Sequence, residues 1–152
     1  MALQNEQDIH IIASLLKSIP LFETLSETDH AEIIKHITMD YLPASYELFK
    51  EGEAGDKMYV IKSGIVRIYH AGETASFDQE LAMLGDNDFF GEMALIDEAP
   101  RNASAKTVEP TQVFILKKED FLKLISENPS MAEKISKEFL DRVKKNTRDK
   151  NV

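Results

Sequence analysis

The region between Tyr41 and Lys117 most constrains how this chain can fold, because its hydrophobic residues recur with a period of two and glycines interrupt them at regular intervals. Met58–Ile61 and Ile65–Tyr69 are rich in β-branched and aromatic residues, which favour strands, and Ser63–Gly64 between them is typical of a tight turn. Further strands are expected at Tyr46–Phe49, Phe77–Leu84, Ala103–Thr107 and Thr111–Leu116. Several short strands at this spacing indicate an antiparallel sandwich or barrel and not a parallel sheet.

Hydrophobic residues on both sides of this region follow helical spacing instead. Asp8–Ser18 predicts a first helix, and Ser26–Asp29 is a variant of the capping box that predicts a second helix, closed at Asp40. After the strands, Lys118–Ser126 is amphipathic, and Asn128–Pro129 has the residue types that open a last helix. The chain is therefore expected to place helices before and after a β-structure.

Charge and composition exclude several classes of function. The 152 residues carry a net charge of −9, which disfavours nucleic acid and anionic membranes as partners because both would be repelled. The chain has no cysteine, so disulfides and cysteine-based metal sites are excluded. It has neither a basic, apolar signal sequence at its start nor an apolar run long enough to span a membrane, so a cytoplasmic location is expected.

The stretch Phe89–Ala105 contains the residues best suited to binding a ligand. Gly91 allows a sharp turn and a close approach to the backbone. The short helix expected after it has free amide groups at its N-terminus, which attract anions. Arg101 offers a planar set of donors suited to phosphate, and Glu92 can accept hydrogen bonds from sugar hydroxyls. Together they suggest a small phosphorylated sugar as ligand.

This stretch resembles the phosphate-binding cassette of the cyclic-nucleotide-binding domain family. The matching residues are Phe90, Gly91, Glu92, Ala94, Leu95, Pro100, Arg101 and Ala103. A second match, from Glu51 to Val66, resembles the family's glycine-rich barrel signature. One departure is Asn87, where the family usually has glycine; asparagine tolerates the left-handed conformation, so the turn can survive.

The resemblance implies a mainly β fold with flanking helices, namely an eight-stranded antiparallel jelly-roll β-barrel with an N-terminal helical bundle and a C-terminal helix pair. It implies a single domain over residues 1–152, with helices in 1–40, the barrel in 41–117, the cassette in 89–105 and the last helices in 118–150.

The resemblance also implies a role for individual residues. Arg101 would pair with the phosphate, supported by the backbone amides of Ala94 and Asn102. Glu92 and the Gly91 amide would hold the ribose 2′-hydroxyl. Further residues would contact the base from the barrel or close over it from the last helix; these are Ile68, Leu81 and Leu84 for the barrel and Phe139 or Val143 for the lid.

The expected function is therefore that of a cyclic-nucleotide sensor, with cyclic AMP favoured over cyclic GMP. Because no effector segment is expected beside the domain, the sensor would signal to an unknown partner protein in trans through its C-terminal helices. The last helix could form a homodimer or fold on its own domain. The alternative is an interaction module on the same fold whose pocket no longer binds nucleotide. An enzyme is not expected, since no catalytic cofactor is implied and the four histidines form no evident metal cluster.

Overall fold

The computed structural model describes residue 3 and residues 5–137, and its β-structure consists of eight strands in two antiparallel sheets of four. The first sheet has the order β1 (Thr38–Leu42), β8 (Thr111–Lys117), β3 (Lys57–Ser63) and β6 (Phe89–Phe90). The second has the order β2 (Glu47–Phe49), β7 (Ser104–Thr107), β4 (Val66–His70) and β5 (Gln79–Leu84). The predicted strand number is confirmed.

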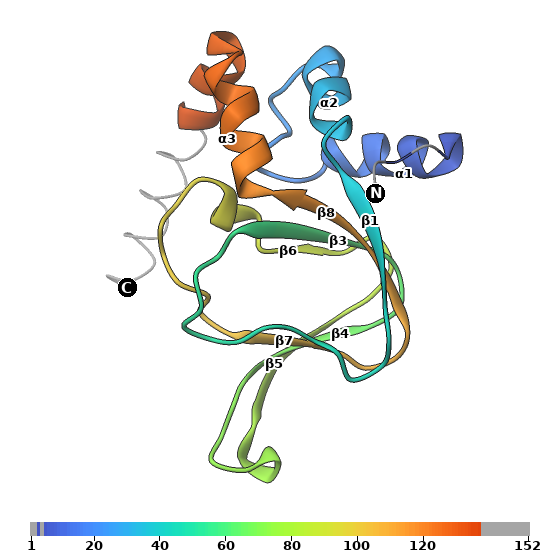
Figure 1. Ribbon diagram of the computed structural model, residues 1–152, viewed down its shortest axis with the longest axis vertical. Coiled ribbons are helices and arrows are strands. Elements are labelled where there is room, and N and C mark those ends of the chain that lie inside the picture. Colours follow the sequence, from blue (N-terminus) through green and yellow to red (C-terminus); the bar gives the residue numbers. More distant parts are fainter. Residues whose placement is uncertain (1–2, 4, 138–152) are drawn as a thin grey trace.

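The prediction of a closed barrel is wrong. No ladder joins the two sheets, so among the described residues each sheet ends in edge strands and the two pack as a sandwich (Figure 1). The edge strands are β1 and β6 in the first sheet and β2 and β5 in the second, and in the described part of the chain none of these pairs with a strand of the other sheet. Side chains from both sheets fill the interior; Tyr59 and Phe90 stack there with ring centroids 5.0 Å apart.

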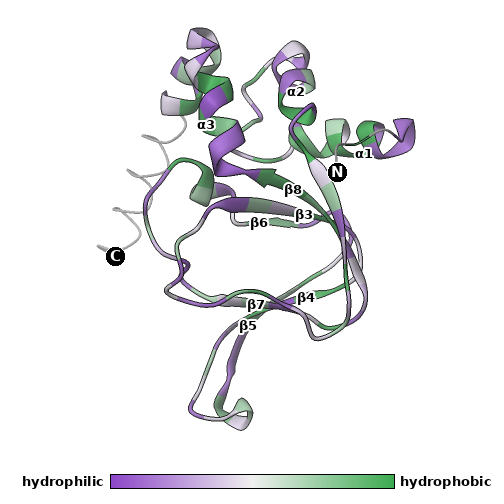
Figure 2. Ribbon diagram, in the orientation of Figure 1, coloured by the Kyte–Doolittle hydropathy of each residue, from purple (hydrophilic) through white to green (hydrophobic). Residues whose placement is uncertain are grey.

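The larger hydrophobic core lies outside the sandwich, between the first sheet and the helices. These are α1 (Glu6–Leu16), α2 (Glu27–Ile34), α3 (Lys118–Ser126) and the helical residues 129–137. Figure 1 shows the helices together on one side, while the β4–β5 hairpin extends from the other. Hydrophobic segments of β8 and the helices meet there (Figure 2), and Phe22 and Phe121 contact edge to face at 5.7 Å. None of the described helices is both long and apolar enough to cross a bilayer.

Two predicted boundaries are wrong. The second helix ends at Ile34, and residues 38–42 form β1 in what was expected to be the end of the helical region. All five residues of β1 pair with β8, so tertiary pairing overrides the helical pattern. The strand expected from Phe77 begins only at Gln79, because Ala75–Phe77 forms a short 3₁₀ helix, η1, at the hairpin tip, where Phe77 is 74% exposed.

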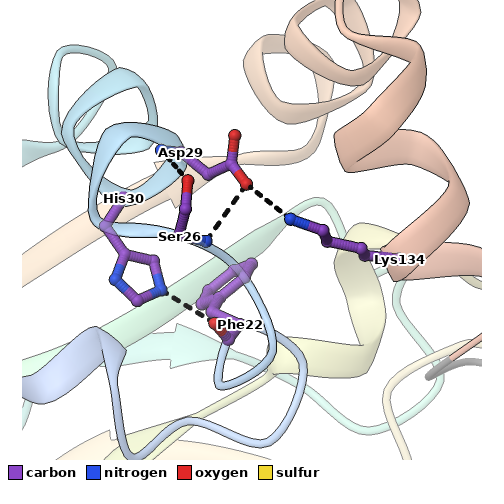
Figure 3. A network of polar contacts seen from close by, with 5 residues as sticks. All are labelled: Phe22, Ser26, Asp29, His30 and Lys134. Carbon is purple, nitrogen blue, oxygen red and sulfur yellow. Dashed lines mark hydrogen bonds and ion pairs between the residues drawn. The ribbon is translucent and has the colours of Figure 1, made fainter.

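A polar network joins the N-terminal helices to the last helix (Figure 3). The predicted capping box is confirmed: the Asp29 amide donates to Ser26 Oγ, and the Ser26 amide donates to Asp29 Oδ2. The same Oδ2 is 3.5 Å from Lys134 Nζ in the helical residues 129–137. Beside it, buried His30 places Nε2 2.8 Å from the Phe22 carbonyl oxygen. The two helical regions are thus in direct contact, although about a hundred residues separate them.

Candidate functional site

The cassette connects the two sheets. It begins in β6, turns at Gly91 into the 3₁₀ helix η2 (Glu92–Leu95), and returns through Pro100 and Arg101 to β7. Gly91 has φ +78°, and a Cβ there would lie 2.7 Å from Arg101 Nη1. Glycine therefore suits this position for two reasons: the backbone is left-handed, and the guanidinium lies close to it.

The backbone of Arg101 is fixed by the glycine-rich turn about fifty residues earlier. The Arg101 amide donates to the Glu53 carbonyl at 2.8 Å, and the Gly52 amide donates to the Arg101 carbonyl at 2.7 Å. An isolated bridge pairs Ala54 with Pro100 beside them. Figure 1 shows the turn after β2 and the loop before β7 on the same side of the sandwich. The two sequence motifs are thus halves of one site.

The side chain of Arg101 is a buried cation that forms no ion pair in the described part of the chain. It is 8% exposed, and none of the ion pairs among residue 3 and residues 5–137 includes it. Nη2 donates to the Lys57 carbonyl at 2.8 Å, and the guanidinium carbon lies 4.1 Å above the centre of the Phe49 ring. Nε is buried and has no hydrogen-bond partner among these residues.

Electrostatics at this position favour an added anion. Burial lowers the pKa of Arg101, and the nearby groups Tyr59, Asp56 and Glu53 offset this in part. Burial likewise raises the pKa of Tyr59 to about 12. A guanidinium stays protonated at neutral pH, so the buried charge persists and an unpaired donor remains. Burying a charge is unfavourable unless it is paired, and an anion bound at the guanidinium would supply a partner for the charge.

Glu92 is the second buried charged group of the cassette, with 7% exposure. The Leu21 amide, in the connection between α1 and α2, donates to Glu92 Oε2 at 3.4 Å. The carboxylate therefore links the cassette to the N-terminal helices. A carboxylate accepts several hydrogen bonds, so it can hold a hydroxyl group as well.

A cavity of about 370 Å³ opens along the cassette. This is within the range of about 300–1,000 Å³ typical of small-molecule sites. The predicted cassette residues Gly91, Glu92, Ala94, Arg101 and Asn102 all line it. The Ala94 amide, predicted to bind phosphate, donates here to the Gly91 carbonyl at 3.2 Å, so it would have to share or exchange that bond.

The residues predicted for the base lie elsewhere. Ile68 and Leu84 pack against the interior of the sandwich, and none of the three predicted residues lines the cavity. Leu81 is 47% exposed, as is Met83 two residues further along β5 at 49%, and Leu81 has no partner where the β4–β5 pairing shifts between Ile68–Ala82 and Tyr69–Glu80. Their contact with a base stays a prediction. The predicted lid residues Phe139 and Val143 lie outside the described residues.

Sequence reasoning missed three contributors to the site, namely Phe49, the Lys57 carbonyl and the Leu21 amide. Two of them act through the backbone, so their side chains give no signal. Phe49 stands three residues before Gly52, and its aromatic character marks it only as a strand residue. Its contact with Arg101 could be expected only if the two motifs were known to meet.

A second hollow, of about 500 Å³, lies between α1 and α2. Its walls are mostly apolar, and its two lysines, Lys17 and Lys35, are exposed and paired with Glu27 and Glu32. Among the described residues, it therefore lacks buried charged side chains such as Glu92 and Arg101 in the cassette cavity. Chemically, the cassette is the better site for a small ligand with one negative charge and a hydroxyl group.

Comparison with known proteins identifies the class to which this site belongs. The family model "Cyclic nucleotide-binding domain" matches residues 40–128, more than half of the chain. The chain belongs to this family. Among curated proteins, the "Cyclic AMP receptor protein" of Thermus thermophilus is 33% identical over 121 residues, which cover 80% of this chain and 56% of that protein. The chain therefore spans only about half of this relative's length.

Two solved structures show the same fold. The N-terminal domain of a transcriptional regulator from Streptomyces coelicolor has a TM-score of 0.77 and 26% identity, and the match covers 91% of this chain and 95% of that one. The regulatory domain of Toxoplasma gondii PKA, crystallised with cAMP, has a TM-score of 0.71 and 25% identity, covering 80% of this chain and 46% of that one.

Proposed function

We propose that this domain is a sensor that binds cyclic AMP in the cassette cavity and signals to a partner protein in trans. The observation that carries the proposal is the buried Arg101, whose Nε has no hydrogen-bond partner among the described residues and whose guanidinium forms no ion pair with any of them. In this proposal the cyclic phosphate pairs with Arg101, and the amides of Ala94 and Asn102 add hydrogen bonds. Glu92 and the Gly91 amide hold the ribose 2′-hydroxyl, which distinguishes the ligand from its deoxy analogue.

The choice of cyclic AMP rests on two supports. The Thermus receptor and the Toxoplasma regulatory domain are named or described with cyclic AMP, although a Caenorhabditis elegans cGMP-dependent protein kinase is also 31% identical over 121 residues. In the resemblance noted above, guanine-selective members commonly carry threonine or serine after the cassette arginine, where this chain has the exposed Asn102. Asparagine could contact guanine, so a direct competition between the two nucleotides decides this point.

The C-terminal helices are the proposed route of the signal. Lys118, the first residue of α3, donates from Nζ to the Asp97 carbonyl at 2.7 Å and from its amide to the Asp56 carbonyl at 2.8 Å. The cassette and the glycine-rich turn therefore both contact the start of α3. A ligand that binds one arrangement of these contacts more tightly shifts the population toward it.

Thermal unfolding with cyclic AMP, cyclic GMP and cyclic di-GMP tests the proposal. A ligand at about 100 times its Kd stabilises the folded state by about 2.7 kcal/mol, which corresponds to a rise in Tm of about 5–10 °C for a domain of this size. We expect this rise with cyclic AMP, together with altered hydrogen exchange in residues 118–137. No rise with any of the three would reject nucleotide binding and favour an interaction module. Unchanged exchange despite binding would reject the helix route.

A further inference from the structure

We infer that Phe49 is a positioning residue for the ligand, because it holds the Arg101 guanidinium in the orientation that an anion requires. This inference rests on the proposed function. It assigns a role to a residue of β2, outside both sequence motifs, that was expected only to form a strand. The guanidinium carbon lies 4.1 Å above the ring centre, within the range of a cation–π contact.

A β-bulge in β2 brings the ring to this place. In the pairing of β2 with β7, Glu47 is opposite Lys106 but Phe49 is opposite Ala105, so the register advances by two residues on one strand and one on the other. In a regular strand, successive side chains point to opposite faces. Here Leu48 and Phe49 both pack against the interior cluster of the sandwich. Bulges often re-aim a side chain beside a functional site.

The ring is itself held in place by two aromatic neighbours. Its centroid lies 6.0 Å from that of Tyr59 and 6.1 Å from that of Phe90, and these two rings stack on each other. The three rings form one cluster under the guanidinium. Phe49 therefore offers Arg101 a supported surface and not a freely rotating side chain.

Phe49 completes an enclosure around the guanidinium. The ring covers one face, the Lys57 carbonyl accepts from Nη2, and the Gly91 backbone approaches Nη1 so closely that a Cβ would lie 2.7 Å away. Nε remains without a partner among the described residues. Holding the side chain before the ligand arrives reduces the ordering that binding would otherwise require.

The experiment compares calorimetric titrations of cyclic AMP into four proteins at one salt concentration. Phe49→Leu keeps an apolar side chain but removes the ring, and we expect a loss of affinity of about 5- to 30-fold. Phe49→Tyr keeps the ring and should restore affinity to within about two-fold. The matched control is Tyr69→Leu, because the Arg67 guanidinium lies 4.4 Å over the Tyr69 ring and, although Tyr69 is opposite Ser104 in the β4–β7 pairing, neither Arg67 nor Tyr69 lines the cassette cavity. It should leave affinity within about two-fold of the wild-type value.

A double variant separates positioning from general stability. If Phe49 acts through the arginine, Phe49→Leu should have no further effect on affinity in an Arg101→Met background, whereas a structural role would persist there. Phe49→Met replaces Phe49→Leu if the latter does not fold.

The outcomes are distinct. A wild-type protein that binds neither cyclic AMP nor cyclic GMP overturns the proposed function, and the positioning role falls with it. A wild-type protein that binds, with Phe49→Leu binding equally well, overturns the positioning role alone. Equal losses in Phe49→Leu and Tyr69→Leu would also overturn it, since they would indicate a loss of stability and not of orientation.

Discussion

Replacing Arg101 with methionine should abolish most nucleotide binding while leaving the ligand-free domain nearly as stable as before. These two effects differ because the arginine is buried and forms no ion pair in the described structure. Removing one partner of a buried, hydrogen-bonded charge pair costs about 3–5 kcal/mol. Since neighbouring Asn102 is exposed, solvent reaches the cavity, and we expect the lower part of this range, a loss of roughly 100- to 1,000-fold in affinity.

The effect on stability follows from opposing contributions. The variant loses the hydrogen bond from Nη2 to the Lys57 carbonyl, about 1.5–3 kcal/mol for a charged donor, and the contact with the Phe49 ring, about 0.5–2 kcal/mol. The variant no longer bears the cost of burying an unpaired ion, which is several kcal/mol and includes the unsatisfied Nε. The net change in the free energy of unfolding should therefore lie within about 1 kcal/mol of zero.

Calorimetric titration with cyclic AMP and urea unfolding without nucleotide measure the two effects. Arg67→Met is the matched control, because Arg67 also lies over an aromatic ring but forms ion pairs with Asp78 and Glu80. It should lose stability and keep its affinity. Unchanged affinity in Arg101→Met would refute the phosphate assignment. Destabilisation of that variant by more than about 2 kcal/mol would show that its charge is compensated after all.

Three further changes have defined outcomes. Gly91→Ala should lower the free energy of unfolding by about 1–2 kcal/mol in urea, since its φ is +78°; equal stability would contradict the strained turn. Glu92→Gln should reduce the preference for cyclic AMP over its 2′-deoxy analogue by about 10-fold in competition binding. An unchanged preference would show that another group contacts the hydroxyl. For Asp29, burial raises the pKa, but the hydrogen bonds with Ser26 and the nearby Lys134 ammonium together lower it by more than burial raises it. The net pKa therefore falls below the ordinary 3.8. Its folded-state pKa is depressed, so its stabilisation is present above pH 3.8 and is lost as the pH falls through the folded value. Asp29→Asn should therefore destabilise by about 1 kcal/mol at pH 7, and the difference from wild type should shrink in acid; a constant difference would exclude the ionised carboxylate as its source.

The turns and the cassette could be predicted from sequence because their chemistry is local. Gly91 takes the left-handed conformation that its residue type allows, and so does Asn87, with φ 72°, where the family usually has glycine. The capping box at Ser26 and Asp29 was likewise visible in the residue types and their spacing. Each of these features depends on residues a few positions apart.

Features that depend on distant pairing could not be predicted in this way. Thr38–Leu42 follows a helix and becomes a strand only because β8 lies beside it. The bulge at Leu48, which brings the Phe49 ring under Arg101, follows from the register against β7 and leaves no mark in the sequence. The same limit explains the wrong prediction of a closed barrel, since strand patterns locate individual strands but do not show which strand edges remain unpaired.

In the proposed signalling route, the contacts of Lys118 limit how α3 can move. With its amide held by Asp56 and its ammonium by Asp97, the first residue of α3 is a fixed pivot, so the helix can tilt about it but cannot easily slide. Displacement then grows with distance along the helix. Over the nine residues of α3, about 13 Å, a tilt of about 10° moves the far end by about 2 Å. The Phe22–Phe121 ring contact lies near the pivot and should change least, whereas the Asp29–Lys134 pair lies far from it and should be the first contact to separate.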